Sequence, residues 1–313
     1  MVDQRADGYA VDTTAGLRAF RDGTMTNMAD GLPDLGQVIA AAGLTPDAFP
    51  AVVAGAGRRR GQTLDSMLRT VRGLTGTADD HIDDLTRTAT TYDGAENAAL
   101  ATVAGTTSST GSGRPAATRS APSTVQAGAT APGGAGPDGI LALYRRLETL
   151  CDAVGLASFV RPVGALLTAN VRDPRTFGDA AVRLDQAHAS AGRLHADVPG
   201  GLDVLAADWT GQAHDAHQAT TLNTYQPHLT TLQDDAQTLA YKDWQSQDAQ
   251  QRFHDRVVVI LGWALLALSA LLIVLALDVL SSGGVRYGIV MLLGAVVVAV
   301  KGAVMALYTD WPE

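Results

Sequence analysis

Apolar positions recur at steps of three and four residues through two long stretches near the start of the chain. The first covers residues 12–42, where Gly31 and Pro33 interrupt the pattern. The second alternates steps of four and three over residues 64–99, as a heptad seam does. Because proline removes a helical hydrogen bond, we expect a kink or break near Pro33. Together the stretches predict an antiparallel helical hairpin within residues 9–104.

A second hairpin is predicted within residues 138–255, after a short amphipathic helix over residues 140–154. In the first arm, Pro199-Gly200-Gly201 should break or bend the helix, and Pro227 should kink the second arm. The sharp turn between the arms is Ala207-Asp208-Trp209-Thr210-Gly211. There Gly211 can take a backbone conformation that other residues resist, and Trp209 can close the end of the helix pair.

Residues 105–137 separate the two hairpins. All but four of residues 106–137 are Gly, Ala, Pro, Ser or Thr, and Val125 is the only large apolar residue among them. Such a segment cannot bury a core, so we expect a disordered linker. The two hairpins could pair within the chain into one four-helix bundle, or each could find an outside partner.

The last part of the chain, residues 256–313, has a different pattern. Residues 257–280 and 285–308 are almost continuously apolar, and each stretch would make a helix of about 36 Å, enough to cross a membrane. We expect a tight turn between them that contains Gly283 and Gly284. Asp278 would lie near one membrane interface, and Lys301 would lie within reach of the other. The alternative is a buried hairpin inside a soluble bundle. The fold class is therefore all-α, with a C-terminal transmembrane hairpin.

Charge and composition exclude several classes of protein. The net charge of −9 disfavours a nucleic-acid-binding protein, which needs basic patches. The start of the chain lacks the apolar run of a Sec signal peptide, so export would need another route. Cys151 is the only cysteine and fits an apolar helical face, where it would act as a small core residue. No arrangement of nucleophile and base points to an enzyme, and we expect no cofactor.

Three polar motifs could suggest ligand sites, but each has a simpler interpretation. The acids of residues 79–84, around His81, fall largely on the solvated side of a helix, which disfavours a metal site. His214 and His217 have ligand-like spacing but lack acidic or cysteine partners, so we expect a solvated or boundary position. Residues 58–60 are three arginines, which we expect in an exposed loop, with lipid or partner contact as the less favoured alternative.

The stretch around Trp209-Thr210-Gly211 resembles the WXG (ESAT-like) family of type VII secretion. The Asp-Pro entry at residues 173–174, the turn and the Ala-rich second arm are similar to longer actinobacterial members. Residues 9–100 resemble the EspC-like secretion-associated proteins. These resemblances cover about two thirds of the chain. They imply a helix–turn–helix fold, four-helix packing with a helical-hairpin partner or a second copy, and export through the type VII machinery.

That family also uses an export element, Tyr-x-x-x-Asp/Glu, after the second arm. Tyr92 and Glu96 match this element at the end of the first hairpin, whereas the second hairpin lacks it. A spacing of four places the two side chains on one helix face. The alternative is a core tyrosine with a boundary glutamate. If the two hairpins pair, the turn at Trp209 and the Tyr92 element would form two halves of one recognition surface.

The sequence therefore predicts a non-enzymatic type VII secretion substrate that associates with or inserts into a membrane. The first alternative is a resident plasma-membrane scaffold or adaptor that binds partner hairpins. The second is a soluble chaperone-like partner whose apolar end another protein masks. In the first case the protein is exported and membrane-associated, and in the scaffold case it is an integral plasma-membrane protein.

Overall fold

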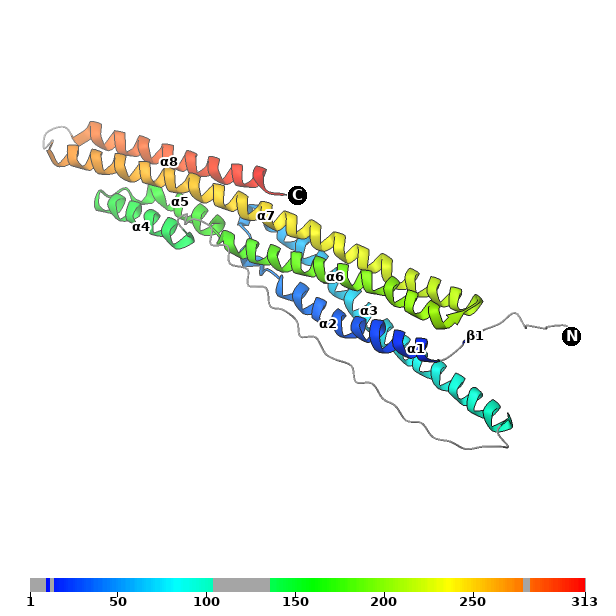
Figure 1. Cartoon of the computed structure of the whole chain (residues 1–313). Helices are drawn as coiled ribbons and strands as arrows, with labels where there is room; N and C mark the ends of the chain where they lie inside the picture. Colours follow the sequence, from blue (N-terminus) through cyan, green and yellow to red (C-terminus); the bar gives the residue numbers. More distant parts are fainter. Residues whose placement is uncertain (1–9, 12–13, 104–135, 278–281, 313) are drawn as a thin grey trace. The chain divides into compact units, whose positions relative to one another are not determined.

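The structure, a computed structural model, describes residues 10–11, 14–103, 136–277 and 282–312 (Figure 1). The chain is all-α, as the sequence predicted, and its last two helices are long and apolar. The only strands in the described ranges are β1 (Ala10–Val11) and β2 (Trp209–Thr210), which pair with each other. Nearly all of the predicted linker lies outside the described residues.

The first arm of the first hairpin is helical throughout, but the helix is irregular at residues 21–25 and not near Pro33, where the sequence predicted an interruption. It consists of α1 (Ala15–Phe20), a π-helical segment (Arg21–Met25) and α2 (Thr26–Ala41). At the π-segment the Thr26 hydroxyl donates to the Arg21 carbonyl at 2.9 Å, which helps to satisfy the widened turn. We expected a kink or break near Pro33; this residue lies inside α2, so the helix does not break there.

The second arm, α3 (Ala54–Val103), begins earlier than expected. The heptad seam is largely confirmed, because Leu64, Val71, Ala78, Leu85 and Ala89 are buried. The Gly- and Arg-rich stretch, expected as a loop, forms the first turns of this helix. Gly57 is needed there because a side chain would collide with the ring of Phe49. The predicted arginine patch is therefore wrong in part: Arg58 and Arg59 are exposed, but Arg60 is buried.

Two helices precede the second hairpin, of which only one was predicted. α4 (Pro137–Ala153) matches the expected amphipathic helix. After a turn at Gly155, whose φ is +74°, α5 (Ala157–Asn170) returns beside it. Pro162 lies in the first part of α5 and does not prevent the helix. The close approach of the two helices requires Gly164, because a side chain there would collide with the ring of Tyr144.

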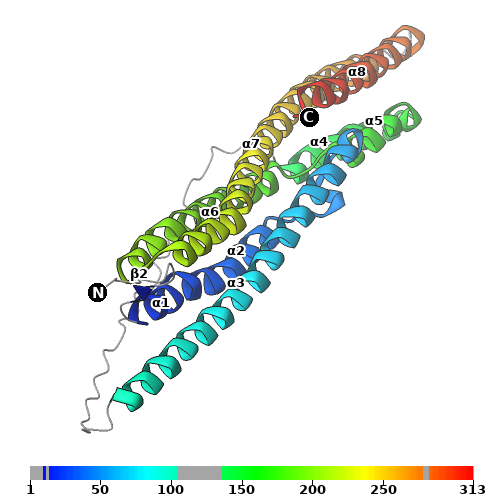
Figure 2. The same ribbon diagram turned by 90° about the vertical axis from the view of Figure 1, so that its right-hand side faces the viewer.

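The second hairpin consists of α6 (Pro174–Asp208) and α7 (Gln212–Leu277), which run side by side from the turn at β2 (Figure 2). Asp173 caps α6 by accepting a hydrogen bond from the Arg175 amide at 3.0 Å. The predicted break at Pro199-Gly200-Gly201 does not occur. A side chain at Gly201 would instead collide with Thr24, so this glycine allows close packing against the first arm.

The apolar end of α7 and α8 (Ser282–Asp310) form the predicted C-terminal hairpin. α7 continues through Pro227 and the second arm into the apolar segment without interruption. The boundary expected at residue 256 is therefore not a helix end. Gly283 and Gly284 also belong to α8, so their assignment to the turn is wrong. Asp278 lies outside the described residues.

The chain divides into two compact units, and both combine the two hairpins. The turn unit falls within residues 1–30, 75–132 and 196–225. The membrane-hairpin unit falls within residues 31–74, 133–195 and 226–313. In the second of these, Arg183 of α6 donates to the Ala41 carbonyl at the end of α2. The hairpins thus pair within the chain, which was one of the two arrangements left open by the sequence.

Candidate functional site

The predicted hinge lies at a sharp reversal between α6 and α7. α6 ends at Asp208, and α7 begins at Gln212. Gly211 joins them with a φ of +104°, a conformation that residues with a side chain rarely adopt. The carbonyl of Gly211 accepts the first helical hydrogen bond, from the Asp215 amide at 3.1 Å. The role predicted for this glycine is therefore confirmed.

The turn also pairs with the start of the chain, which the sequence did not predict. Ala10 lies opposite Thr210 and Val11 lies opposite Trp209 in an antiparallel two-residue ladder. Close by, Gly16 of α1 packs so tightly on Asp208 that a side chain would not fit. A two-residue strand has no detectable alternation of apolar and polar positions, so periodicity could not reveal it.

Trp209 points into the turn unit and is only 6% exposed. Its ring contacts His214 and His217, with centroids 5.9 and 5.3 Å apart. His217 in turn contacts Phe20 of α1 and His81 of α3, at 5.9 and 4.9 Å. The indole therefore contributes to a core made by both hairpins, and it offers little surface to a partner.

The histidines of two separate motifs meet in this cluster. His214 is 7% exposed, so the solvated or boundary position expected for it is wrong. The sequence marked His81 and His217 separately, and only the pairing of the hairpins brings their rings together. His81 also stacks on Tyr225, with the rings 3° from parallel. No three His, Cys, Asp or Glu side chains in the described part of the chain are grouped to hold a metal ion.

Three members of the cluster, His81, Trp209 and His217, line a pocket of about 410 Å³ within the turn unit. Both hairpins line it, and the lining side chains include Asp84, Thr88, Trp209, His217 and Thr221. Four buried atoms of this region have no hydrogen-bond partner in the protein: Trp209 Nε1, His214 Nε2, His217 Nε2 and Thr221 Oγ1. The region is therefore polar in composition but lies in a largely buried setting.

Burial lowers the pKa of two histidines in this cluster, His217 and His81. Desolvation, helped by the neighbouring imidazoles of His81 and His214, lowers the pKa of His217 to about 4. Desolvation also lowers the pKa of His81, although the carboxylate of Asp84 acts in the opposite direction. The pKa of the buried Tyr225 hydroxyl is raised for the same reason.

Tyr92 belongs to the same unit as the hinge. It lies on α3 one helical turn beyond Thr88, which lines the pocket together with Trp209. Its ring is half-buried, and the next residue, Asp93, accepts hydrogen bonds from Thr14 and Arg18. Glu96 is helical, but its side chain is not among those described. The two proposed halves of the recognition surface thus occupy one unit, with Trp209 turned inward.

The second candidate site is the C-terminal hairpin. Two described helices are long and apolar enough to cross a membrane by length and composition. Only 22% and 33% of their most apolar stretches are buried, whereas a core helix of a soluble protein is mostly buried. Large apolar side chains are exposed along both helices: Val259, Trp263, Leu266, Ile273, Tyr287, Met291, Val298, Met305 and Tyr308. These findings support association with a membrane.

Charged side chains lie toward the end of this hairpin where the apolar segment of α7 begins and α8 ends. Lys301 is exposed on α8, as the predicted reach to an interface requires. Near the end of α8, Asp310 accepts a hydrogen bond from Arg256 at 3.3 Å and lies 3.9 Å from Arg252. Both arginines belong to the part of α7 that leads into the apolar segment.

No protein-family model, curated protein or solved structure matches this chain. The resemblance to the WXG and EspC-like proteins therefore stays a prediction from the residues quoted above.

Proposed function

We propose that this chain is a non-enzymatic substrate of a type VII secretion system, with a C-terminal hairpin that associates with or inserts into a membrane. The observation that carries the proposal is the Trp209-Thr210-Gly211 hinge, placed between two long helices at a glycine with positive φ. A three-residue motif is common by chance, but its occurrence at a helical reversal is what the resemblance requires.

The position of Tyr92 adds support. The resemblance requires that the hinge and the Tyr-x-x-x-Glu element act together, although they lie on different hairpins. The chain supplies both within the turn unit, and α3 carries Tyr92 one turn beyond a pocket that Trp209 also lines. One molecule therefore carries both elements within one unit, without a partner hairpin.

The experiment compares export with and without an active type VII ATPase. The full chain is expressed in a host that has such a system, and cytosol, membranes and medium are separated. We expect the protein outside the cell or in the envelope only when the ATPase is active. An equal amount in the plasma membrane of both strains would contradict export.

Two variants test the recognition surface. Tyr92→Ala and Glu96→Ala should each reduce export several-fold, while Thr91→Ala, at an exposed neighbouring position, should export normally. Because Tyr92 is half-buried, the melting temperature of each variant is measured alongside export. Unchanged export of both variants would contradict the proposed element.

The second candidate function is a resident plasma-membrane scaffold that binds partner hairpins. The continuity of α7 favours it, because the second arm and the apolar segment form one 66-residue helix from Gln212 to Leu277. A continuous helix of this kind suits an anchor that links a hairpin to the membrane. The same fractionation separates the two functions, because a scaffold stays in the plasma membrane whether or not the ATPase works.

A further inference from the structure

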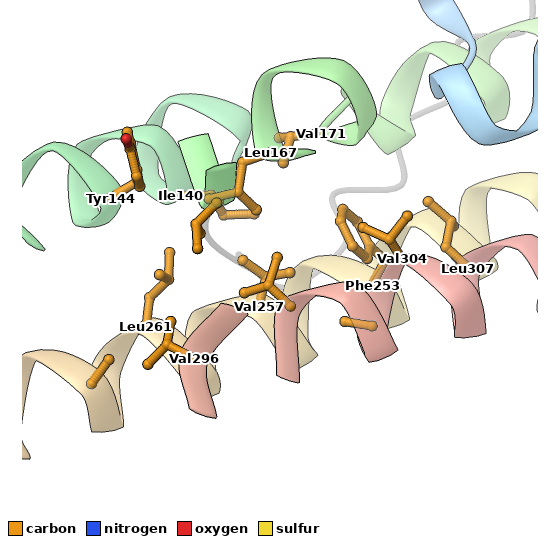
Figure 3. Close-up of a cluster of buried hydrophobic side chains, with 14 of the residues drawn as sticks. Ile140, Tyr144, Leu167, Val171, Phe253, Val257, Leu261, Val296, Val304 and Leu307 are labelled. Carbon is orange, nitrogen blue, oxygen red and sulfur yellow. The ribbon is translucent and has the colours of Figure 1, made fainter. Parts of the chain in front are cut away.

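The helices α4 and α5 cover one face of the C-terminal hairpin. Their inner face is apolar, and six of its side chains are completely buried: Ile140, Leu147, Cys151, Val160, Val163 and Leu167. They share one core cluster with α7 and α8, in which α5 packs along α8. Figure 3 shows Ile140 and Leu167 above Val257 and Leu261 of α7. The cover is thus part of a packed core.

The outer face of this cover is polar and charged. Arg145, Arg146 and Asp152 of α4, and Arg161 of α5, are exposed. A charged side chain in the hydrocarbon core costs about 2.5–3.5 kcal/mol even on a permissive insertion scale. Four such charges cannot enter the bilayer beside the hairpin at a tolerable cost. The covered hairpin therefore needs water against the outer face of α4 and α5, and it cannot be surrounded by lipid.

The surface beneath the cover has the opposite preference. In the core cluster that α7 and α8 share with the cover, Val257, Leu261 and Leu268 of α7, and Ile289, Leu293 and Val300 of α8, are fully buried and wholly apolar. Lipid chains could replace the cover against these side chains with little loss, because hydrocarbon is as apolar as the cover's inner face. Replacement of the cover by lipid chains therefore costs the hairpin little free energy. It also keeps the four charged side chains out of the hydrocarbon core.

We propose that α4 and α5 form a releasable cover, which packs on the hairpin before insertion and leaves it when the hairpin enters the bilayer. The inference rests on the membrane part of the proposed function and adds a mechanism that controls it. The released helices remain amphipathic, with an apolar face flanked by three arginines. Such helices bind at the surface of an anionic membrane, which compensates for the lost packing.

Crosslinking between α5 and α8 tests the release directly. Phe159 of α5 lines a pocket together with Ala295 of α8, so the two positions are neighbours in the covered state. Cysteines are placed at both in a Cys151→Ser background, which removes the only native thiol. The matched control pair is Leu271→Cys with Gly288→Cys, which joins α7 to α8: a side chain atom added at Gly288 would lie 3.9 Å from Leu271.

The full chain is made by cell-free synthesis with or without vesicles of phosphatidylethanolamine and phosphatidylglycerol, and a short bismaleimide is added. We expect both pairs to crosslink without vesicles. In the carbonate-resistant vesicle fraction, the control pair should still crosslink and the α5–α8 pair should lose most of its crosslinking. Protein crosslinked between α5 and α8 before vesicles are added should insert several-fold less than the control.

The outcomes separate the inference from the proposed function. Inserted protein whose α5–α8 pair crosslinks as well as the control pair would overturn the cover alone. Failure of the uncrosslinked chain to bind vesicles, with both pairs crosslinked in solution, would overturn membrane insertion and the cover with it.

Loosening the cover supplies a second measurement, because Leu147→Glu should insert faster than the wild type. Thr149→Glu, exposed on the same helix, should not, and equal rates for the two variants would contradict the inference.

Discussion

At the scale of single residues, a buried ion pair joins the two hairpins in the membrane-hairpin unit. Arg60 of α3 contacts Asp243 of α7 through Nε at 2.8 Å and through a terminal nitrogen at 2.7 Å. The same terminal nitrogen donates to the Ala42 carbonyl at 2.8 Å. Desolvation raises the pKa of the Asp243 carboxyl, and the guanidinium of Arg60 opposes that rise. The pair therefore depends on both members being present.

Removal of Arg60 should destabilise the protein strongly. Arg60→Ala leaves Asp243 buried without its partner, and breaking such a pair costs about 3–5 kcal/mol. Arg59→Ala is the matched control, because Arg59 is exposed and its loss should change the free energy of unfolding by less than about 0.5 kcal/mol.

Urea unfolding followed by circular dichroism measures both changes. The double variant Arg60→Met with Asp243→Leu should regain much of the lost stability, since an apolar pair can replace a buried ion pair. A double variant no more stable than Arg60→Ala would show that the cost comes from packing and not from an unpaired charge.

At the scale of elements, glycines determine how closely α4 and α5 approach. Gly155 makes the turn with a left-handed conformation, and the Leu156 amide donates to the Cys151 carbonyl at 2.8 Å to close the end of α4. Gly164 then accommodates the ring of Tyr144. The periodicity of the sequence predicted α4 but not α5, whose first part contains Pro162. Tertiary packing over a buried apolar face outweighed the local cost of the proline.

Valine at position 164 should separate these two helices. Gly164→Val forces overpacking against Tyr144, which costs about 1–3 kcal/mol. Ala165→Val is the control, because it places valine at the exposed neighbouring position. It shares the helix-propensity cost of valine with Gly164→Val but not the collision with Tyr144. Limited proteolysis between α4 and α5 should become faster in Gly164→Val alone. Equal proteolysis of both variants would exclude close packing at Gly164.

At the scale of the whole molecule, the histidine cluster makes the turn unit sensitive to acid. His217 has a folded-state pKa of about 4 against an ordinary value of 6.5, so the unfolded chain binds more protons between these values. Its contribution to stability is therefore complete above pH 6.5 and is lost as the pH falls toward 4. The titratable side chains near His217 are His81, His214, Asp80, Asp84 and Asp215.

The melting temperature should consequently fall between pH 7 and pH 4.5. After allowance for solvent screening of this partly exposed ring, His217 accounts for about 1–2 kcal/mol of this loss. His217→Gln should be less stable at pH 7 but should show a smaller decrease on acidification. His228→Gln, at an exposed site on the same helix, should retain the full decrease. Identical pH dependence in both variants would contradict a role for His217.

Patterns along the chain were enough to predict the helical class, most of the seam of α3, the hinge at Gly211 and the apolar C-terminal hairpin. Each of these depends on local periodicity or on the backbone of one residue, and both are properties of neighbours along the chain. The folded chain alone shows that the hairpins pair with each other and that Arg60 contacts Asp243. It also shows that His81 contacts His217, and that α4 and α5 cover the C-terminal hairpin. Those features join side chains more than a hundred residues apart, or replace solvent with packing, and no local pattern records such contacts.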